Sequence, residues 1–292
     1  MEQMGYPSIS IIIPTYNRCH FLRNALQSVI EQDYPNLHVF VVDGGSTDDT
    51  STMVKAFAMQ YPFVHLLQNA YKSGASGAKN TAIAVLCSEL FAVLDDDDIL
   101  LHGALKRLAE TYMQYDRQYG IILGNRLRSD TKEYTGRGID KSREVAAEEF
   151  WFGSLSGKFF GIFQTQLIGE DRFDEELKGG DRLFWNKIYA KSKIYYLHQP
   201  MRIYSIHSDS LTQALNTQPL IEARNYEKEI AFLKELHDHH EKVNYLATLH
   251  NKLARLYLAG NEKFKAREHL KKSLSCKLGF EAFGMWLRSY VY

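Results

Sequence analysis

Cysteine is scarce in this chain, which has 3 in 292 residues, and no two of them form a Cys-x-x-Cys pair. That spacing gives no framework for a cysteine-bound zinc ion, and it is typical of a protein from a reducing compartment. A net charge is missing as well, because 35 Lys and Arg balance 35 Asp and Glu. The balance provides no general attraction to nucleic acid, so we expect no nucleic-acid partner.

Long apolar runs are also absent. Residues 1–8 contain no basic stretch followed by an apolar one, so no signal peptide is expected. The run from Ile9 to Ile13 stops at Pro14 and is far too short to cross a bilayer. These absences predict a cytoplasmic protein whose membrane contact is limited to its periphery, on the inner face of the cell membrane.

Short apolar segments and amphipathic segments alternate through the first hundred residues. This alternation predicts a sheet of parallel strands with helices on both faces. Ser46 or Thr47 is expected to cap the second helix. Farther along, two separate short strands are expected at 193–197 and 201–204. The other expected strands include 9–13, 37–42, 63–67 and 91–94. The first helices are expected at 21–30 and 49–61, and a third is expected to open within 73–80 and to run through Leu86.

The strand at 91–94 ends in four consecutive aspartates, Asp95 to Asp98. Packed carboxylates repel one another and resist desolvation. A hard divalent cation bound through oxygen ligands would relieve that repulsion and leave room for substrate phosphates. The alternative is a solvated acidic turn that caps the helix expected near His102, but a cap needs only one carboxylate.

Three strands of the expected sheet end in polar or aromatic side chains. Tyr16 follows the first strand, Asp43 the second, and Asp95 to Asp98 a later one. Ligands of such sheets bind at the carboxyl ends of the strands. The convergence predicts a binding site at that edge.

Several segments resemble the motifs of family 2 glycosyltransferases, in the order and spacing of that family. The pair Gly180-Asp181 also resembles the family's Glu-Asp pair, and Tyr204 with His207 resembles its later Tyr-x-x-His pattern. The resemblance covers roughly residues 8–212. The segments that carry its first half are 11–17 (IIIPTYN), 41–48 (VVDGGSTD), 77–80 (GAKN) and 94–98 (LDDDD).

The resemblance implies an α/β protein with a GT-A fold, in which a Rossmann-like mixed sheet is flanked by helices. It also implies an inverting transferase with a nucleotide-sugar donor, Mg²⁺ or Mn²⁺, and a saccharide or lipid-linked saccharide as acceptor. Surface polysaccharide assembly is the expected setting. Residues 1–215 would then form the catalytic domain, with a donor half of about 1–125 and an acceptor half of about 126–215, followed by a helical extension at 216–292.

The family motifs also imply roles for individual residues. Asp97 is the expected main metal ligand, with Asp95 beside it and His207 as a weaker candidate. Asp96 would reach the donor ribose. Tyr16 would lie against the nucleobase unless it is an aromatic at the core edge, and Lys79 would face the pyrophosphate unless it is a solvated helix residue. The expected donor-binding residues are Pro14, Thr15, Tyr16, Asn17, Asp43, Lys79, Asp95 and Asp96.

Inversion in a single displacement needs a base that takes the proton of the attacking hydroxyl. Asp181 is the expected base from its position in the family motif, and a helix cap is its alternative role. Glu170 and Asp171 are nearby carboxylates that could replace it. One departure concerns Gly44, where many family members have a second Asp that often contacts uracil. UDP is therefore a preference, and either Asp43 takes over that contact or the nucleobase differs.

Two other stretches have two readings each. The aromatic-rich stretch 150–163 is expected to be core packing or a wall for a sugar acceptor. Residues 262–292 mix basic and aromatic side chains, which is typical of a helix lying on an anionic membrane surface. Packing of that tail on the catalytic domain is the alternative.

The residues argue against two rival functions. A sugar nucleotidyltransferase would need a glycine-rich, arginine-containing phosphate loop after the first strand, and Pro14 to Asn17 does not provide one. A non-catalytic module that binds partners through its helical tail would have no need for Asp97 and Asp181.

Overall fold

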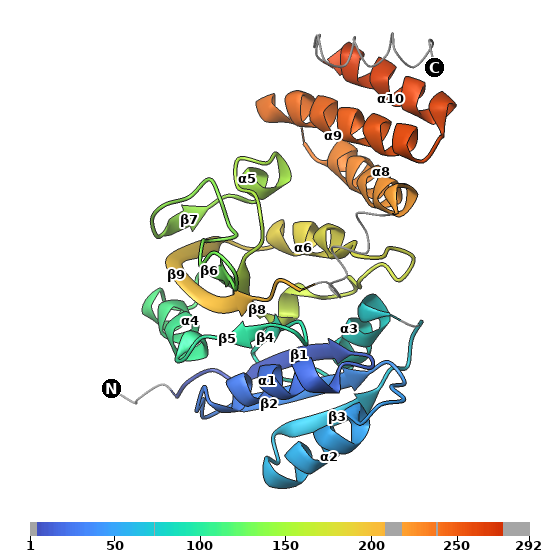
Figure 1. Cartoon of the computed structure of the whole chain (residues 1–292). Coiled ribbons are helices and arrows are strands. Elements are labelled where there is room, and N and C mark those ends of the chain that lie inside the picture. Colours follow the sequence, from blue (N-terminus) through green and yellow to red (C-terminus); the bar gives the residue numbers. More distant parts are fainter. Residues whose placement is uncertain (1–4, 73, 208–217, 238, 277–292) are drawn as a thin grey trace. The chain divides into compact units, whose positions relative to one another are not determined.

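The computed structural model describes residues 5–72, 74–207, 218–237 and 239–276 (Figure 1). The chain divides into two compact units. The first unit consists of Met1–Phe150, Ser154–Glu175 and Phe184–Ile206, and the second of Trp151–Gly153, Glu176–Leu183 and His207–Tyr292. The division expected at residues 215 and 216 stays a prediction.

A mixed sheet forms the centre of the first unit. Its strand order is β3-β2-β1-β4-β8-β6-β9-β5, and β7 pairs with β9. The four strands β1 to β4 run parallel, whereas β8 is antiparallel to both β4 and β6. The expected mixed sheet is thus confirmed. The strands are β1 Ile9–Thr15, β2 Leu37–Asp43, β3 Val64–Gln68, β4 Leu90–Val93, β5 Ile99–Leu100, β6 Ile121–Arg128, β7 Arg143–Val145, β8 Phe160–Gln164 and β9 Ile194–Tyr204.

Helices cover both faces of this sheet, because alternate strand residues point to opposite sides. In β1, Ile11 and Ile13 pack in one core with residues of α1, α2 and α4, and Ile12 packs in the other core with α3 and α6. The helices are α1 Cys19–Ile30, α2 Thr50–Gln60, α3 Ala75–Ile83, α4 Ala104–Gln114, α5 Ala147–Trp151 and α6 Asp181–Tyr189, with a 3-10 turn at Thr165–Leu167.

Two local expectations are wrong. The strands expected at 193–197 and 201–204 are one continuous strand, β9, and the irregular residues between them follow a register shift opposite Gly124 and Asn125 of β6. Neither Ser46 nor Thr47 caps α2. The backbone N–H of Thr50 donates to Asp48 Oδ1 at 3.0 Å instead.

The aromatic stretch 150–163 packs in the protein interior. Phe150, Phe160 and Phe163 are buried in the first unit. Trp151 and Phe152 are buried in the second unit, where Trp151 contacts Phe232 and Phe152 stacks on His239. The core reading therefore holds for these rings.

The described residues of the second unit form three long helices, α8 Pro219–Glu235, α9 His240–Ala259 and α10 Lys263–Cys276 (Figure 1). Helix α9 packs against both α8 and α10. Within the described residues, no helix combines the length and the apolar character that a membrane span requires. About half of the stretch 262–292, in which a membrane-surface helix was expected, is residues 277–292, which lie outside the described residues.

Candidate active site

The carboxyl ends of β1, β2 and β4 meet at one edge of the sheet, as expected. The β1 end contacts the β4 end, since Thr15 Oγ1 donates to Asp96 Oδ2 at 2.8 Å. It also contacts the β2 end, where the Asn17 N–H donates to Ser46 Oγ at 2.8 Å and Asn17 Oδ1 accepts from the Thr47 N–H at 2.7 Å. Three loops from distant parts of the sequence thus build one continuous surface.

The four aspartates after β4 alternate between buried and accessible positions. The side chains of Asp96 and Asp98 are 6% and 0% exposed, whereas those of Asp95 and Asp97 are 44% and 12% exposed. The accessible pair is spaced by one residue. Asp95 and Asp97 are therefore the carboxylates that remain for a ligand, and the other two belong to the protein interior.

Two arginines neutralise this acidic turn, and each of them pairs with two of the aspartates. Arg18, just before α1, lies 3.1 Å from Asp96 and 2.8 Å from Asp97. Arg202 of β9 is itself buried and lies 2.9 Å from Asp95 and 2.8 Å from Asp98. A buried charge needs a partner of this kind, because its desolvation is otherwise uncompensated.

The surroundings shift the acidities of these carboxylates in different directions. Burial raises the pKa of Asp96 to about 7, although Arg18 and the hydrogen bond from Thr15 act against the shift. Burial also raises the pKa of Asp98, against Arg202. Desolvation works in the same sense at Asp95, but the charges of Arg202 and Lys79 outweigh it and hold the pKa of Asp95 below its usual range.

Sequence reasoning missed both arginines. Arg18 directly follows the family segment 11–17, so its position beside that motif was a signal. Arg202 is a single charge within the run Met201 to Tyr204, which otherwise has the pattern of a strand. An arginine inside a buried strand requires a carboxylate partner, and that requirement pointed to the acidic turn.

The other predicted donor residues lie in different environments. Tyr16 is 57% exposed, which excludes a place at the core edge, and Lys79 is 2% exposed, which excludes a solvated helix residue. The Lys79 ammonium group lies 4.9 Å from the centre of the Phe173 ring. Asp43 is buried, and its Oδ1 accepts hydrogen bonds from the backbone of Gly45 and Ser46 and from the Ser46 hydroxyl, so that oxygen already holds its own turn together.

Asp181 and His207 belong to the second unit. Asp181 is the first residue of α6, and its neighbour Arg182 pairs with Glu229 of α8. His207 is half-buried. Of the alternative bases, Asp171 is paired with Lys187 at 3.2 Å and Lys191 at 2.6 Å, so its carboxylate already serves two ion pairs.

The acidic turn fits a divalent cation by the chemistry of its donors. Asp95 and Asp97 offer hard oxygen ligands, and two carboxylates leave further positions for substrate phosphates and water, as Mg²⁺ prefers. Among the described residues, three ligand atoms lie within 4.8 Å of one another only at His239, His240 and Glu241. That group stands at the N-terminus of α9, where the helix dipole disfavours a cation, and His239 Nδ1 already accepts from the Glu241 N–H at 3.2 Å.

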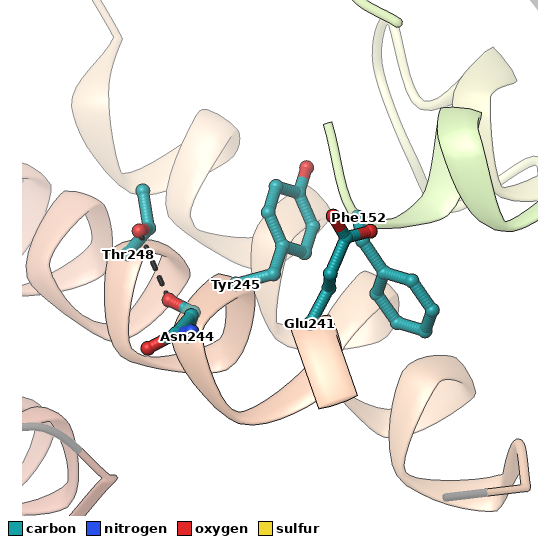
Figure 2. A pocket seen from close by; sticks show the side chains of 5 residues that line it. All are labelled: Phe152, Glu241, Asn244, Tyr245 and Thr248. Carbon is teal, nitrogen blue, oxygen red and sulfur yellow. Dashed lines mark hydrogen bonds between the residues drawn. The ribbon is translucent and has the colours of Figure 1, made fainter. Parts of the chain in front are cut away.

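The second unit has a pocket of about 220 Å³, and Figure 2 shows the side chains that line it. Its two rings are engaged within the unit, Phe152 against His239 and the Tyr245 hydroxyl with Arg182. No residue that was predicted for the donor, the metal or the base lines it. The lining residues are Phe152, Glu241, Asn244, Tyr245 and Thr248.

Two bacterial relatives share substantial identity with this chain. The GalNAc(5)-diNAcBac-PP-undecaprenol beta-1,3-glucosyltransferase of Campylobacter jejuni is 35% identical over 209 residues, which are 70% of this chain and 67% of that protein. The UDP-Glc:alpha-D-GlcNAc-diphosphoundecaprenol beta-1,3-glucosyltransferase WfgD of Escherichia coli is 38% identical over 117 residues, which are 40% of this chain and 45% of that protein.

Solved structures match the fold. TarS 1-349 of S. aureus matches with a TM-score of 0.70 and 19% identity over 97% of this chain and 89% of that chain. Its complex with UDP-GlcNAc matches with a TM-score of 0.64. The mannosyltransferase PcManGT of Pyrobaculum calidifontis, solved with GDP-Man and Mn²⁺, gives a TM-score of 0.59 and 18% identity over 99% of this chain and 81% of its own. These matches show that the fold is GT-A.

The model of the family "Glycosyl transferase family 2" matches residues 10–168, more than half of the chain. The matched segment includes β1, β2 and β4 and the acidic turn that follows β4. The C. jejuni relative supports the same assignment over a longer stretch. The chain therefore belongs to glycosyltransferase family 2, and the protein is a glycosyltransferase.

Proposed function

We propose that this enzyme transfers a sugar from a UDP-sugar to a hydroxyl of a saccharide carried on undecaprenyl diphosphate, with inversion at the anomeric carbon. The observation that carries the proposal is the acidic turn, which presents Asp95 and Asp97 at the carboxyl edge of three strands. Glucose is the first sugar to test, because both relatives are named as beta-1,3-glucosyltransferases that act on such carriers. The UDP-GlcNAc complex of TarS supports uridine as the base.

The donor would be bound by the loops after β1, β2 and β4. In this proposal exposed Tyr16 offers a ring for the nucleobase. Asp96 is buried against Thr15 and Arg18, so it would give up one of these contacts to reach the donor ribose. Pro14, Thr15 and Asn17 shape the loop, Asp43 orders the neighbouring turn, and Lys79 contributes positive charge near Asp95. A divalent cation, Mn²⁺ or Mg²⁺, held by Asp97 and Asp95 would supply charge neutralisation for the leaving diphosphate. His207 is a further candidate ligand.

Asp181 is the proposed base. The acceptor oxygen forms a bond to the anomeric carbon while the bond from that carbon to the diphosphate oxygen breaks, and UDP leaves. The acceptor proton passes to the Asp181 carboxylate. A β-linked product from an α-linked nucleotide sugar requires this single inversion, which agrees with the beta linkages in the names of both relatives.

The division of the chain and its setting follow from the same proposal. Residues 1–125 would bind the donor and residues 126–215 the acceptor, with 216–292 as the helical extension. A lipid-linked acceptor would bring the enzyme to the inner face of the cell membrane as a peripheral protein.

The test is transfer by the full-length chain. Purified enzyme is incubated with a synthetic undecaprenyl-diphosphate monosaccharide and a panel of UDP- and GDP-sugars, with Mn²⁺ or EDTA, and products are identified by mass spectrometry and NMR. We expect a β-linked product from a UDP-sugar that forms only with the cation and is lost in Asp97→Asn. Undiminished transfer in EDTA, or an α-linked product, would refute the mechanism.

A further inference from the structure

We propose that Arg182, Glu229 and Tyr245 form a positioning network that holds the catalytic base Asp181 in place. The inference rests on the proposed role of Asp181 as base. The three residues come from α6, α8 and α9, and all belong to the second unit. The helical extension would then have a catalytic task, beyond any role as an appendage.

The contacts of the network form a closed triangle. Arg182 Nη2 lies 3.0 Å from Glu229 Oε1 and donates a hydrogen bond to the Tyr245 hydroxyl. That hydroxyl in turn donates to Glu229 Oε1 at 3.3 Å. Each polar group of the triangle therefore serves two partners, which fixes the geometry better than a single ion pair does.

The burial of Glu229 makes this triangle costly to break. Glu229 is only 4% exposed. Its burial raises the pKa of the Glu229 carboxyl, while Arg182 and the hydrogen bond from Tyr245 act in the opposite direction. Burial and the neighbouring Glu229 raise the pKa of Tyr245 to about 12, so its phenol stays protonated and can both donate and accept at neutral pH.

The loop just before α6 is tied to α8 as well. Asn225 Nδ2 donates to the Lys178 carbonyl at 2.8 Å, and Arg224 lies 3.7 Å from Glu176. Within the loop, a Cβ at Gly180 would come within 2.4 Å of Leu177 Cβ, so only glycine permits this close fold. Contacts with α8 therefore hold segment 176–183 on both sides of its turn, and Asp181 is next to Arg182, which makes the ion pair with Glu229.

A base acts only when its carboxylate is correctly placed, and a displacement of about 1 Å can cost on the order of 10²-fold in rate. Arg182 follows Asp181 in the first turn of α6. The contacts of Arg182 with Glu229 of α8 and Tyr245 of α9 limit how that turn can rotate or fray. The network would thus act on turnover through Asp181, without contacting the substrate itself.

The test uses Tyr245→Phe in the full-length chain, since this variant keeps the ring and the ion pair of Arg182 with Glu229 but removes the hydroxyl. We expect kcat to fall about tenfold to 10²-fold, with the KM for the nucleotide sugar unchanged. Tyr257→Phe is the matched control, because the Tyr257 hydroxyl donates to Glu227 of α8 at 2.5 Å and joins the same two helices without Arg182. The control should keep its kcat.

The decisive comparison is made in an Asp181→Asn background. If the network acts through Asp181, adding Tyr245→Phe to Asp181→Asn lowers kcat no further. If kcat is normal for Tyr245→Phe but low for Asp181→Asn, the positioning network is refuted and the base is not. The network is also refuted if the double variant loses kcat by the product of the two single losses. A normal kcat for Asp181→Asn would instead refute the base itself. Arg182→Lys, which keeps the charge, should lie between wild type and Tyr245→Phe.

Discussion

Arg18 Nη2 lies 2.8 Å from Asp97 Oδ2, so a guanidinium holds the carboxylate that is proposed to bind the divalent cation. A cation that binds Asp97 must share this oxygen or displace the arginine. The acidic turn is thus neutralised by the protein's own side chains before a cation arrives.

The first prediction follows from that competition. Arg18→Gln should tighten Mn²⁺ binding in the absence of nucleotide by up to about fivefold, because a partly exposed ion pair contributes at most about 1 kcal/mol. Titration calorimetry with MnCl₂ measures the change. Arg23→Gln, at an exposed position of the same helix, is the control and should bind like wild type. Weaker binding by Arg18→Gln would contradict the prediction.

The second prediction separates base from metal ligand. Asp181→Asn should bind the nucleotide sugar nearly normally while kcat falls about 10²- to 10⁴-fold. Asp97→Asn should weaken donor binding as well as the rate. Donor calorimetry beside steady-state kinetics distinguishes the two.

Asp171→Asn is the control for the base, since the Asp171 carboxylate pairs with Lys187 and Lys191. Its kcat should stay within a fewfold of wild type. Equal loss of donor binding in Asp181→Asn and Asp97→Asn would show that this division of roles is wrong, and Glu170 or Asp171 would become the next candidate base.

The third prediction concerns the free energy of unfolding. Arg202→Met leaves the fully buried Asp98 without its cationic partner, and such losses typically cost about 3–5 kcal/mol. Arg128→Met is the matched control, because Arg128 pairs with Asp130 near the surface, where the loss should be at most about 1 kcal/mol. Urea unfolding followed by circular dichroism compares the variants, and similar losses would refute the buried pairing as the cause.

The fourth prediction concerns pH. His250 and His269 are buried with their Nδ1 atoms 2.9 Å apart. Burial, and then the charge of His269, lowers the pKa of His250 from 6.5 to about 4. Lys272 of α10 and Lys234 of α8 act in the same direction on both rings, while Glu227 of α8 opposes them at His269.

A histidine with a lowered pKa takes up its proton more readily when unfolded. Its stabilising contribution is therefore complete above pH 6.5 and is lost progressively toward pH 4. The loss is at most about 1.4 kcal/mol per pH unit for each histidine. His250→Gln should flatten the pH dependence of unfolding between these limits, and His20→Gln, at an exposed position, should leave it unchanged. Identical curves for His250→Gln and wild type would contradict the assignment.

The sheet and the edge that carries the site were predictable from local patterns. The strands β1, β2 and β4 are short, mostly apolar runs, and Tyr16, Asp43 and Asp95 stand where these runs end. The reversal of β8 and the continuity of β9 were not predictable, because strand direction and bulges depend on pairing between residues far apart in the sequence.

The ion-pair partners of the charged residues could not be predicted from the sequence either. Which arginine neutralises which aspartate depends on contacts between Arg18 or Arg202 and a turn that is distant in the sequence. The same holds for Arg182, whose partners Glu229 and Tyr245 lie on two helices of the extension. The pattern of those helices indicates an apolar face, but not the polar group that each one buries.

The alternation along the acidic turn means that its four identical residues do not have the same freedom to change. Asp98 is enclosed and bound to Arg202, so glutamate there would need space that the interior does not offer. Asp98 and Arg202 can be exchanged for an apolar pair only together, because the loss of one leaves the charge of the other buried and unpaired. Asp95 and Asp97 reach solvent, so the ligand rather than the fold determines which residue types these positions accept. A search for related enzymes should therefore weigh position 98 jointly with position 202, and positions 95 and 97 with the substrate.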